Sequence, residues 1–133
     1  MRSVWVDANV FIRLLTNDTP QHAERAQKLM GRAARGDLLL LVPTVVIAEI
    51  VWALASFYHY ERSTIATGLQ SLVTAEGVAV EGADAVVDAL TLMVDKNVDF
   101  ADAYLTAVAG ARGEEVASFD ADLKRLGARV LTF

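Results

Sequence analysis

The sequence contains no cysteine and only two prolines among its 133 residues. The absence of cysteine excludes a disulfide framework, a thiolate zinc site and a cysteine nucleophile, and it suits a reducing compartment. We therefore expect a cytoplasmic protein. The longest apolar run, residues 38–48, is interrupted by Pro43 and is shorter than the roughly 20 apolar residues of a membrane span, so we expect no membrane-spanning segment. Met1-Arg2-Ser3 leads directly into a strand-like segment, a start that is not typical of a signal peptide.

Basic residues are fewer than acidic ones, 12 against 17, which gives a net charge of −5. This balance argues against a protein that binds duplex DNA through charge alone. It is compatible with a protein whose acids gather at one metal site. The chain is 54% hydrophobic and 22% charged, so it can bury a sizeable core, and intrinsic disorder is excluded.

Strand-like and helix-like segments alternate along the chain. The predicted strands are residues 3–6, 38–42, 78–80, 116–119 and 129–133, and the predicted helices are residues 10–15, 20–35, 43–57, 61–75, 83–96, 99–112 and 121–126. The strand segments are uniformly apolar, as in buried parallel sheets. We therefore expect one α/β domain over residues 1–133: a three-layer α/β/α sandwich around a central, mainly parallel sheet of four or five strands.

Four acidic positions lie in apolar surroundings at strand ends or on helices that should pack beside them. Asp7 ends the first strand, Glu49 lies inside the third predicted helix, Asp102 (with Asp99) opens a later helix, and Asp120 follows the fourth strand. Burial of a lone ionised carboxylate costs several kcal/mol, and converging carboxylates also repel one another. These acids are therefore either apart and solvated or held together by a cation.

Each acid except Glu49 also has a simple structural interpretation. Asp7 and Asp120 could cap the helices that follow them, and Asp99 and Asp102 have the spacing of a capping box. Glu49 does not fit this interpretation because its neighbours one helical turn away are all apolar. That pattern leaves the helix no solvent-facing side, so we expect Glu49 to point into a polar site.

Carboxylate oxygens favour Mg²⁺, with Mn²⁺ as an alternative, since both are hard cations that retain waters. The two histidines, His22 and His59, lie far in sequence from the acidic motifs, so zinc is not expected. Carboxylates that hold one or two such ions can hydrolyse a phosphodiester: the metal lowers the pKa of a bound water, and a carboxylate can accept its proton.

The acidic motifs, taken in order, resemble a PIN domain, the fold of many metal-dependent ribonucleases. Four segments are similar in particular to the bacterial VapC-type toxins: VDANVFIRLLTND (6–18), VPTVVIAEIVWAL (42–54), DFADAYLTAVA (99–109) and SFDADLKRLG (118–127). The likeness covers nearly the whole chain. It implies a metal-binding and catalytic cluster of Asp7, Glu49, Asp102 and Asp120, with Asn9, Asp99 and Ser118 as supporting residues. Asp122 is the alternative for the fourth acid.

The resemblance further implies a Mg²⁺-dependent endoribonuclease that acts on RNA as the toxin of a type II toxin–antitoxin pair. It implies a homodimer and inhibition by a small antitoxin protein. One alternative is a catalytically silent PIN-like scaffold. A second is a phosphatase similar to haloacid dehalogenases with Asp7 as nucleophile, which Asn9 disfavours because such enzymes have an acid there.

Basic and aromatic residues raise two further hypotheses. Arg25, Lys28, Arg32 and Arg35 recur along one side of the second predicted helix. Together with Arg13 they either steer RNA phosphates or form a solvated face. The aromatic run 57–60 either stacks on bases or packs at a helix end.

Overall fold

A parallel sheet of three strands organises the first half of the chain. The strands are β1 (Arg2–Trp5), β2 (Leu38–Val42) and β3 (Val78–Val80), in the order β1-β2-β3. In β2, Leu40 pairs with Val4 of β1 and with Val78 of β3. The computed structural model describes residues 2–133. These form two compact units, one that ends at Ala83 and contains the sheet, and one over Asp84–Phe133.

The burial of the central strand, β2, explains why its apolar run is easily recognised in the sequence as a strand of a sheet. In the segment Leu-Leu-Leu-Leu-Val, Leu38, Leu40 and Val42 are buried, while Leu39 and Leu41 are half-buried. A strand with partners on both edges and apolar residues on both faces has no polar alternation. The predicted range of this strand is confirmed.

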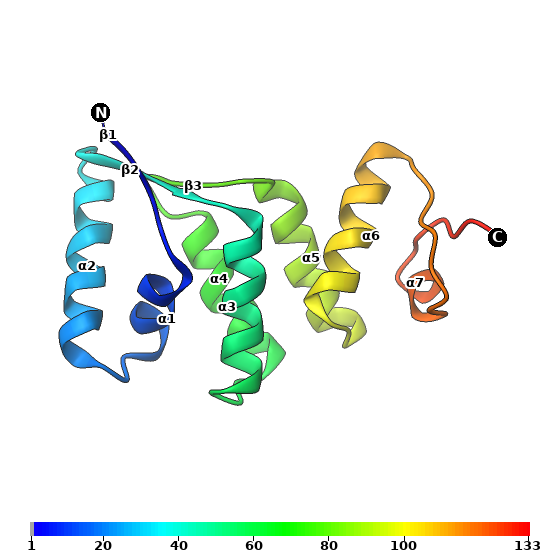
Figure 1. Cartoon of the computed structure of the whole chain (residues 1–133), viewed down its shortest axis with the longest axis horizontal. Coiled ribbons are helices and arrows are strands. Elements are labelled where there is room, and N and C mark those ends of the chain that lie inside the picture. Colours follow the sequence, from blue (N-terminus) through cyan, green and yellow to red (C-terminus); the bar gives the residue numbers. More distant parts are fainter. Residues whose placement is uncertain (1) are drawn as a thin grey trace. The chain divides into compact units, whose positions relative to one another are not determined.

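Four helices complete the first unit (Figure 1): α1 (Ala8–Thr16), α2 (Pro20–Ala34), α3 (Thr44–Ser56) and α4 (Arg62–Val73). α1 packs against α2 and α3, while α2 contacts β2 and α4 contacts β3. The core between them contains Phe11, Ile47, Ile50 and Leu69, all fully buried. This packing fixes α1 and α3 side by side.

The start of α3 is fixed by a residue that is far away in sequence. Thr44 Oγ1 donates a hydrogen bond to the carbonyl oxygen of Glu81 (2.8 Å), and the Thr44 amide donates to Glu81 Oε1 (3.2 Å). A carboxylate at a helix N-terminus satisfies a free amide and is favoured by the helix dipole. The segment after β3 thus anchors the helix that carries Glu49.

The second unit is helical. It contains α6 (Phe100–Arg112), α7 (Asp122–Arg125) and nearly all of α5 (Ala83–Lys96). Its buried side chains include Leu90, Met93, Ala103, Val116 and Leu123. The predicted helix at residues 83–96 is confirmed residue for residue.

The prediction of two further strands is wrong in this structure. Residues 116–119 and 129–133 form only an isolated parallel bridge between Val116 and Val130. Phe119 is 95% exposed and Phe133 is 69% exposed, so their apolar side chains are not in a buried sheet. A two-stranded pair without a third strand is marginal, and apolar extended segments look like strands in the sequence.

The predicted α/β class with a parallel sheet is confirmed, and the helix-rich chain is consistent with a three-layer α/β/α arrangement. The sheet has three strands within residues 2–133, in place of the four or five expected. No helix in that range combines the length and the apolar composition needed to cross a membrane.

Gly77 is required by the close approach of the β3 turn to α2. Its φ is +79°, and an added Cβ would lie 2.3 Å from the carbonyl oxygen of Ala33. We expect Gly77→Ala to lower the free energy of unfolding by about 2–4 kcal/mol, because backbone strain and overpacking add. Urea denaturation measures this change.

Gly110 in α6 supplies the matched control, since no atom within 4 Å would meet an added Cβ there. Gly110→Ala should be neutral or raise the free energy of unfolding by up to about 1 kcal/mol. Equal destabilisation by both substitutions would contradict the steric explanation.

Candidate functional site

Asp7 lies at the carboxyl end of β1, where the chain turns into α1. Its backbone is extended (φ −77°, ψ 152°), and it occupies the N-cap position without a side-chain capping hydrogen bond. The capping interpretation of this side chain is therefore wrong, and its exposed carboxylate stays available. Asn9 follows in the first turn of α1 and is also exposed.

Glu49 is exposed on α3, in contrast to the expectation that this helix has no solvent-facing side. Val45 and Trp52, each about one turn away, are 72% and 61% exposed. The solvent-facing side of α3 is therefore apolar apart from one acid. From the sequence alone, this pattern was interpreted as a helix without a solvent-facing side. An exposed apolar side with one acid is unusual for a solvated helix.

Asn9 and Glu49 line the same depression, of about 500 Å³, which lies between α1 and α3. Arg13, Trp52 and Tyr58 also line it. Two of the predicted site residues, far apart in sequence, are thus brought to one concave surface of the first unit. The packing of α1 on α3 produces this arrangement.

The second unit brings four acids into one neighbourhood. Burial raises the pKa of the Asp102 carboxyl, and the negative charges of Asp120, Asp99 and Asp122 raise it further. Asp102 lies in the first turn of α6 and is half-buried, while Asp99 is the N-cap residue and makes no side-chain capping hydrogen bond. We call these four residues the acidic cluster.

Asp120 and Ser118 shape the loop that leads into α7. The Asp120 amide donates a hydrogen bond to Ser118 Oγ, and Asp120 Oδ1 accepts one from the Asp122 amide, both at 2.9 Å. Asp120 thus satisfies the first amide of α7, although the N-cap residue of this helix is Ala121. Asp122 instead forms an ion pair with Arg125 (3.5 Å), which partly neutralises its carboxylate.

The carboxylates of the acidic cluster are the type of ligand that a hard divalent cation prefers. A carboxylate whose pKa is raised by burial and by neighbouring negative charges is stabilised when a cation offsets its charge. Within residues 2–133, no group of three or more acids or histidines is arranged as a preformed metal site. The acidic cluster thus places the half-buried Asp102 among other carboxylates, of which Asp122 forms an ion pair with Arg125.

Sequence reasoning missed a polar network that joins the α1–α2 loop to the end of α3. The Tyr58 hydroxyl donates to Asp18 Oδ2 (2.6 Å), and Arg13 Nη1 lies 3.0 Å from both Asp18 oxygens. Arg13 is therefore neutralised locally and is not free to steer RNA. Tyr58 acts as a structural residue, although nothing in the local sequence links it to a partner 40 positions away.

The Tyr58 hydrogen bond is the main cause that lowers the pKa of Asp18 to about 2; burial opposes it, and Arg13 and Thr16 assist. We expect Tyr58→Phe to raise this pKa toward the ordinary value of 3.8. Carboxyl ¹³C chemical shifts followed from pH 2 to 6 measure it. Because the pKa is lowered on folding, the stabilisation by the network is complete above the unfolded value and is lost as the pH falls toward 2.

Tyr60→Phe is the control for this titration, because the Tyr60 ring contacts Tyr58 but its hydroxyl makes no hydrogen bond to Asp18. It should leave the Asp18 midpoint unchanged. An unchanged midpoint in Tyr58→Phe would contradict the dominant role of the Tyr58 hydroxyl.

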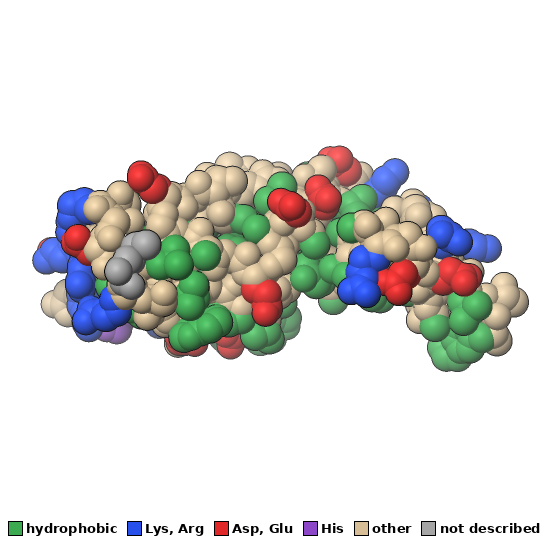
Figure 2. All heavy atoms as spheres, turned by 90° about the horizontal axis from the view of Figure 1, so that it is seen from above, with side chains coloured by type: hydrophobic (Ala, Val, Ile, Leu, Met, Phe, Trp, Pro, Cys, Tyr) green, Lys and Arg blue, Asp and Glu red, His purple; other side chains and the backbone are tan. Residues whose placement is uncertain are grey.

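Basic side chains gather over α2, at the left in Figure 2. Lys28 forms an ion pair with Glu24 (3.2 Å), and Arg35 lies 3.7 Å from Asp37. Arg25 and Arg32 remain exposed, and neither has an ion-pair partner within residues 2–133. Of the four basic residues along this side of α2, only Arg25 and Arg32 thus have no ion-pair partner within residues 2–133. Their guanidinium groups lie two turns apart.

The PIN domain family model matches residues 4–129. The chain therefore belongs to the PIN domain family, whose members are generally metal-dependent nucleases. No curated protein matches the chain in sequence. Membership in the family agrees with the parallel sheet of the first unit.

Proposed function

We propose that this protein is a Mg²⁺-dependent endoribonuclease that hydrolyses RNA phosphodiester bonds, with Mn²⁺ as an alternative metal. The metal ligands and catalytic residues in this proposal are Asp7, Glu49, Asp102 and Asp120. Their order along the chain resembles that of the VapC-type toxins, and the family generally consists of metal-dependent nucleases. Asn9, Asp99 and Ser118 support these carboxylates.

The observation that carries the proposal is the match of residues 4–129 to the PIN domain family, together with the half-buried Asp102, whose pKa burial and three neighbouring acids raise. A structural carboxylate normally has a cation or a donor as its neighbour, which lowers the pKa. Acids placed against one another in a partly buried position are instead characteristic of functional sites. The two assigned acids of the second unit, Asp102 and Asp120, belong to this cluster.

Each residue has a role in the proposed hydrolysis. Asp7, Glu49, Asp102 and Asp120 would hold a divalent ion, which would supply Lewis acidity to lower the pKa of the attacking water and to offset charge at the phosphate. A carboxylate of the site that is not itself bound to the ion would accept the proton of that water. Asp120 is preferred to Asp122 as the fourth acid, because Arg125 already neutralises Asp122.

The biological role that we propose is that of the toxin in a type II toxin–antitoxin pair, as a homodimer inhibited by a small antitoxin protein. The motif resemblance supports this role. The outer side of α3 supports it as well, because Val45, Trp52 and Phe57 are exposed there and a partner protein would bury them.

Cleavage of single-stranded RNA by the purified protein tests the proposal, with Mg²⁺ or Mn²⁺ compared with EDTA and Asp7→Asn as the inactive control. We expect products only with metal and wild-type protein, and 5′-phosphate ends because water is the nucleophile. Products with 2′,3′-cyclic phosphate ends would contradict water activation. Absence of both metal binding and cleavage would favour the scaffold alternative.

A further inference from the structure

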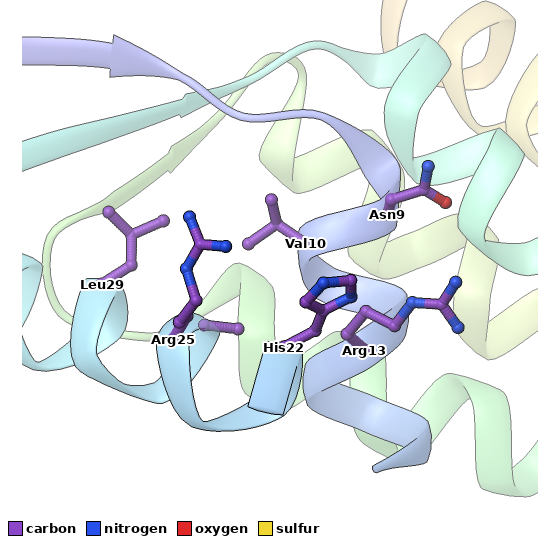
Figure 3. Close-up of a pocket in the computed structure, with 7 residues that line it drawn as sticks. Asn9, Val10, Arg13, His22, Arg25 and Leu29 are labelled. Atoms are coloured by element: carbon purple, nitrogen blue, oxygen red, sulfur yellow. The ribbon is translucent and has the colours of Figure 1, made fainter. Parts of the chain in front are cut away.

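A second depression lies between α1 and α2, with a volume of about 390 Å³. Figure 3 shows that His22 and Arg25 extend from α2 toward Asn9 and Val10 of α1. The volume lies at the lower end of the range for small-molecule sites, about 300–1,000 Å³. The depression is therefore large enough for one nucleotide unit and not for a folded segment.

The polar part of this pocket contains one guanidinium without an ion-pair partner among residues 2–133, that of Arg25, and the imidazole of His22. Arg13 also lines it, but its guanidinium is paired with Asp18. Within residues 2–133, Arg25 and His22 have neither an ion pair nor a side-chain hydrogen bond. Two unpaired nitrogen-bearing side chains at the rim of a pocket favour an anion with several acceptor oxygens, such as a phosphate.

The remaining wall of the pocket is apolar and is formed by Val10, Ala26 and Leu29. An inorganic anion gains nothing from such a wall, whereas a planar base or a ribose buries apolar surface against it. Asn9 adds an amide that can donate to and accept from the edge of a base. The combination of a rim with one guanidinium and one imidazole, an apolar wall and one amide matches the three parts of a nucleotide.

The pocket adjoins the depression that contains Glu49. Asn9 and Arg13 line both, so the two concave surfaces meet across α1. An RNA strand bound with a phosphate near Glu49 can place its neighbouring nucleotide in the α1–α2 pocket.

We propose that the pocket between α1 and α2 binds one nucleotide of the RNA substrate beside the phosphate that is cut. Arg25 and His22 bind the phosphate of this nucleotide, Val10, Ala26 and Leu29 contact its base or ribose, and Asn9 contacts the edge of the base. This inference rests on the proposed function, because it assigns the pocket to the same RNA.

Binding of a fluorescein-labelled single-stranded RNA in EDTA, followed by anisotropy, tests the pocket without cleavage. We expect Arg25→Gln to weaken binding about tenfold or more, the loss expected for a hydrogen-bonded ionic contact. Arg32→Gln is the matched control: Arg32 lies two turns further along the same side of α2, is exposed and does not line the pocket. It should weaken binding less than about threefold, through general charge alone. Equal losses would overturn the inference in favour of a diffuse basic stripe.

Competition distinguishes a nucleotide site from a simple phosphate site. Uridine 5′-monophosphate should displace the labelled RNA at a concentration at least about tenfold lower than inorganic phosphate does, because it also buries apolar surface. Equal potency of the two competitors would overturn the assignment of the apolar wall. Since this assay contains no metal, its outcome is separate from the cleavage assay: metal-dependent cleavage with full RNA binding by Arg25→Gln would overturn only the pocket.

Discussion

Asp102→Asn is expected to reduce metal-dependent RNA cleavage by about 100-fold or more and to leave the protein at least as stable in EDTA. Loss of groups that only support metal ligands commonly costs about 10–100-fold, so loss of a ligand should cost more. Burial and three nearby acids raise the pKa of this carboxyl, so its charged form disfavours folding. The melting temperature in EDTA at pH 7 should therefore be equal or higher in the variant.

The pH dependence of this stability follows from the direction of the pKa shift. A carboxyl with a raised pKa in the folded protein favours folding below its unfolded pKa, and this contribution is lost as the pH rises through the folded value. The advantage of Asp102→Asn should therefore appear at neutral pH and diminish in acid. Thermal melting in EDTA from pH 3 to 7 measures the trend.

Asp95→Asn supplies the control for Asp102→Asn, since Asp95 is an exposed acid of α5 in the same unit. It should change neither cleavage nor melting temperature appreciably. If Asp102→Asn kept wild-type activity, Asp102 would not be a catalytic residue. If the variant melted well below wild type in EDTA, the charge of Asp102 would have a structural partner, in conflict with the acidic cluster.

Glu49→Gln is expected to reduce cleavage by a similar factor, about 100-fold or more, with an unchanged melting temperature in EDTA. Glu49 is exposed, so the amide replaces the carboxylate without a packing change. The substitution removes the carboxylate that we propose as a metal ligand and leaves the apolar neighbours Val45 and Trp52 in place. Single-turnover cleavage with Mg²⁺ measures the effect directly, because it isolates the chemical step.

Glu76→Gln is the matched control for Glu49→Gln, because Glu76 is an exposed glutamate of the same unit that lines neither depression. It should retain full activity. Wild-type cleavage by Glu49→Gln would mean that Glu49 is a solvated acid on an interaction surface, and the depression between α1 and α3 would then have no metal ligand from α3.

The fold was predictable where local chemistry alone determines it. The uniform apolar run of β2 and the helix at residues 83–96 have the observed bounds, because burial and helical periodicity act over short distances. The segments around Val116 and Val130 were wrongly predicted to be strands because their structure does not depend on local chemistry alone. Whether an apolar extended segment becomes a strand depends on a neighbouring strand, which a local pattern does not contain.

The candidate site was predictable in its residue types and only partly in its surroundings. The acids stand out because apolar positions flank them. Asp102 lies near Asp99 and Asp120, whereas the gathering of Asp7, Glu49, Asp102 and Asp120 at one site stays a prediction. Glu49 was expected to lie in a helix without an exposed side and is exposed. The Arg13–Asp18–Tyr58 network depends on contacts across more than 40 residues, so no sequence spacing indicates it.

Titration of the metal-free protein with Mn²⁺, followed by electron paramagnetic resonance, tests the central claim that these carboxylates hold a divalent cation. The account predicts saturable Mn²⁺ binding that Mg²⁺ displaces and that Asp102→Asn weakens at least about tenfold, while Asp95→Asn leaves it unchanged. Equal Mn²⁺ binding by wild type and Asp102→Asn, or no binding by either, would contradict it.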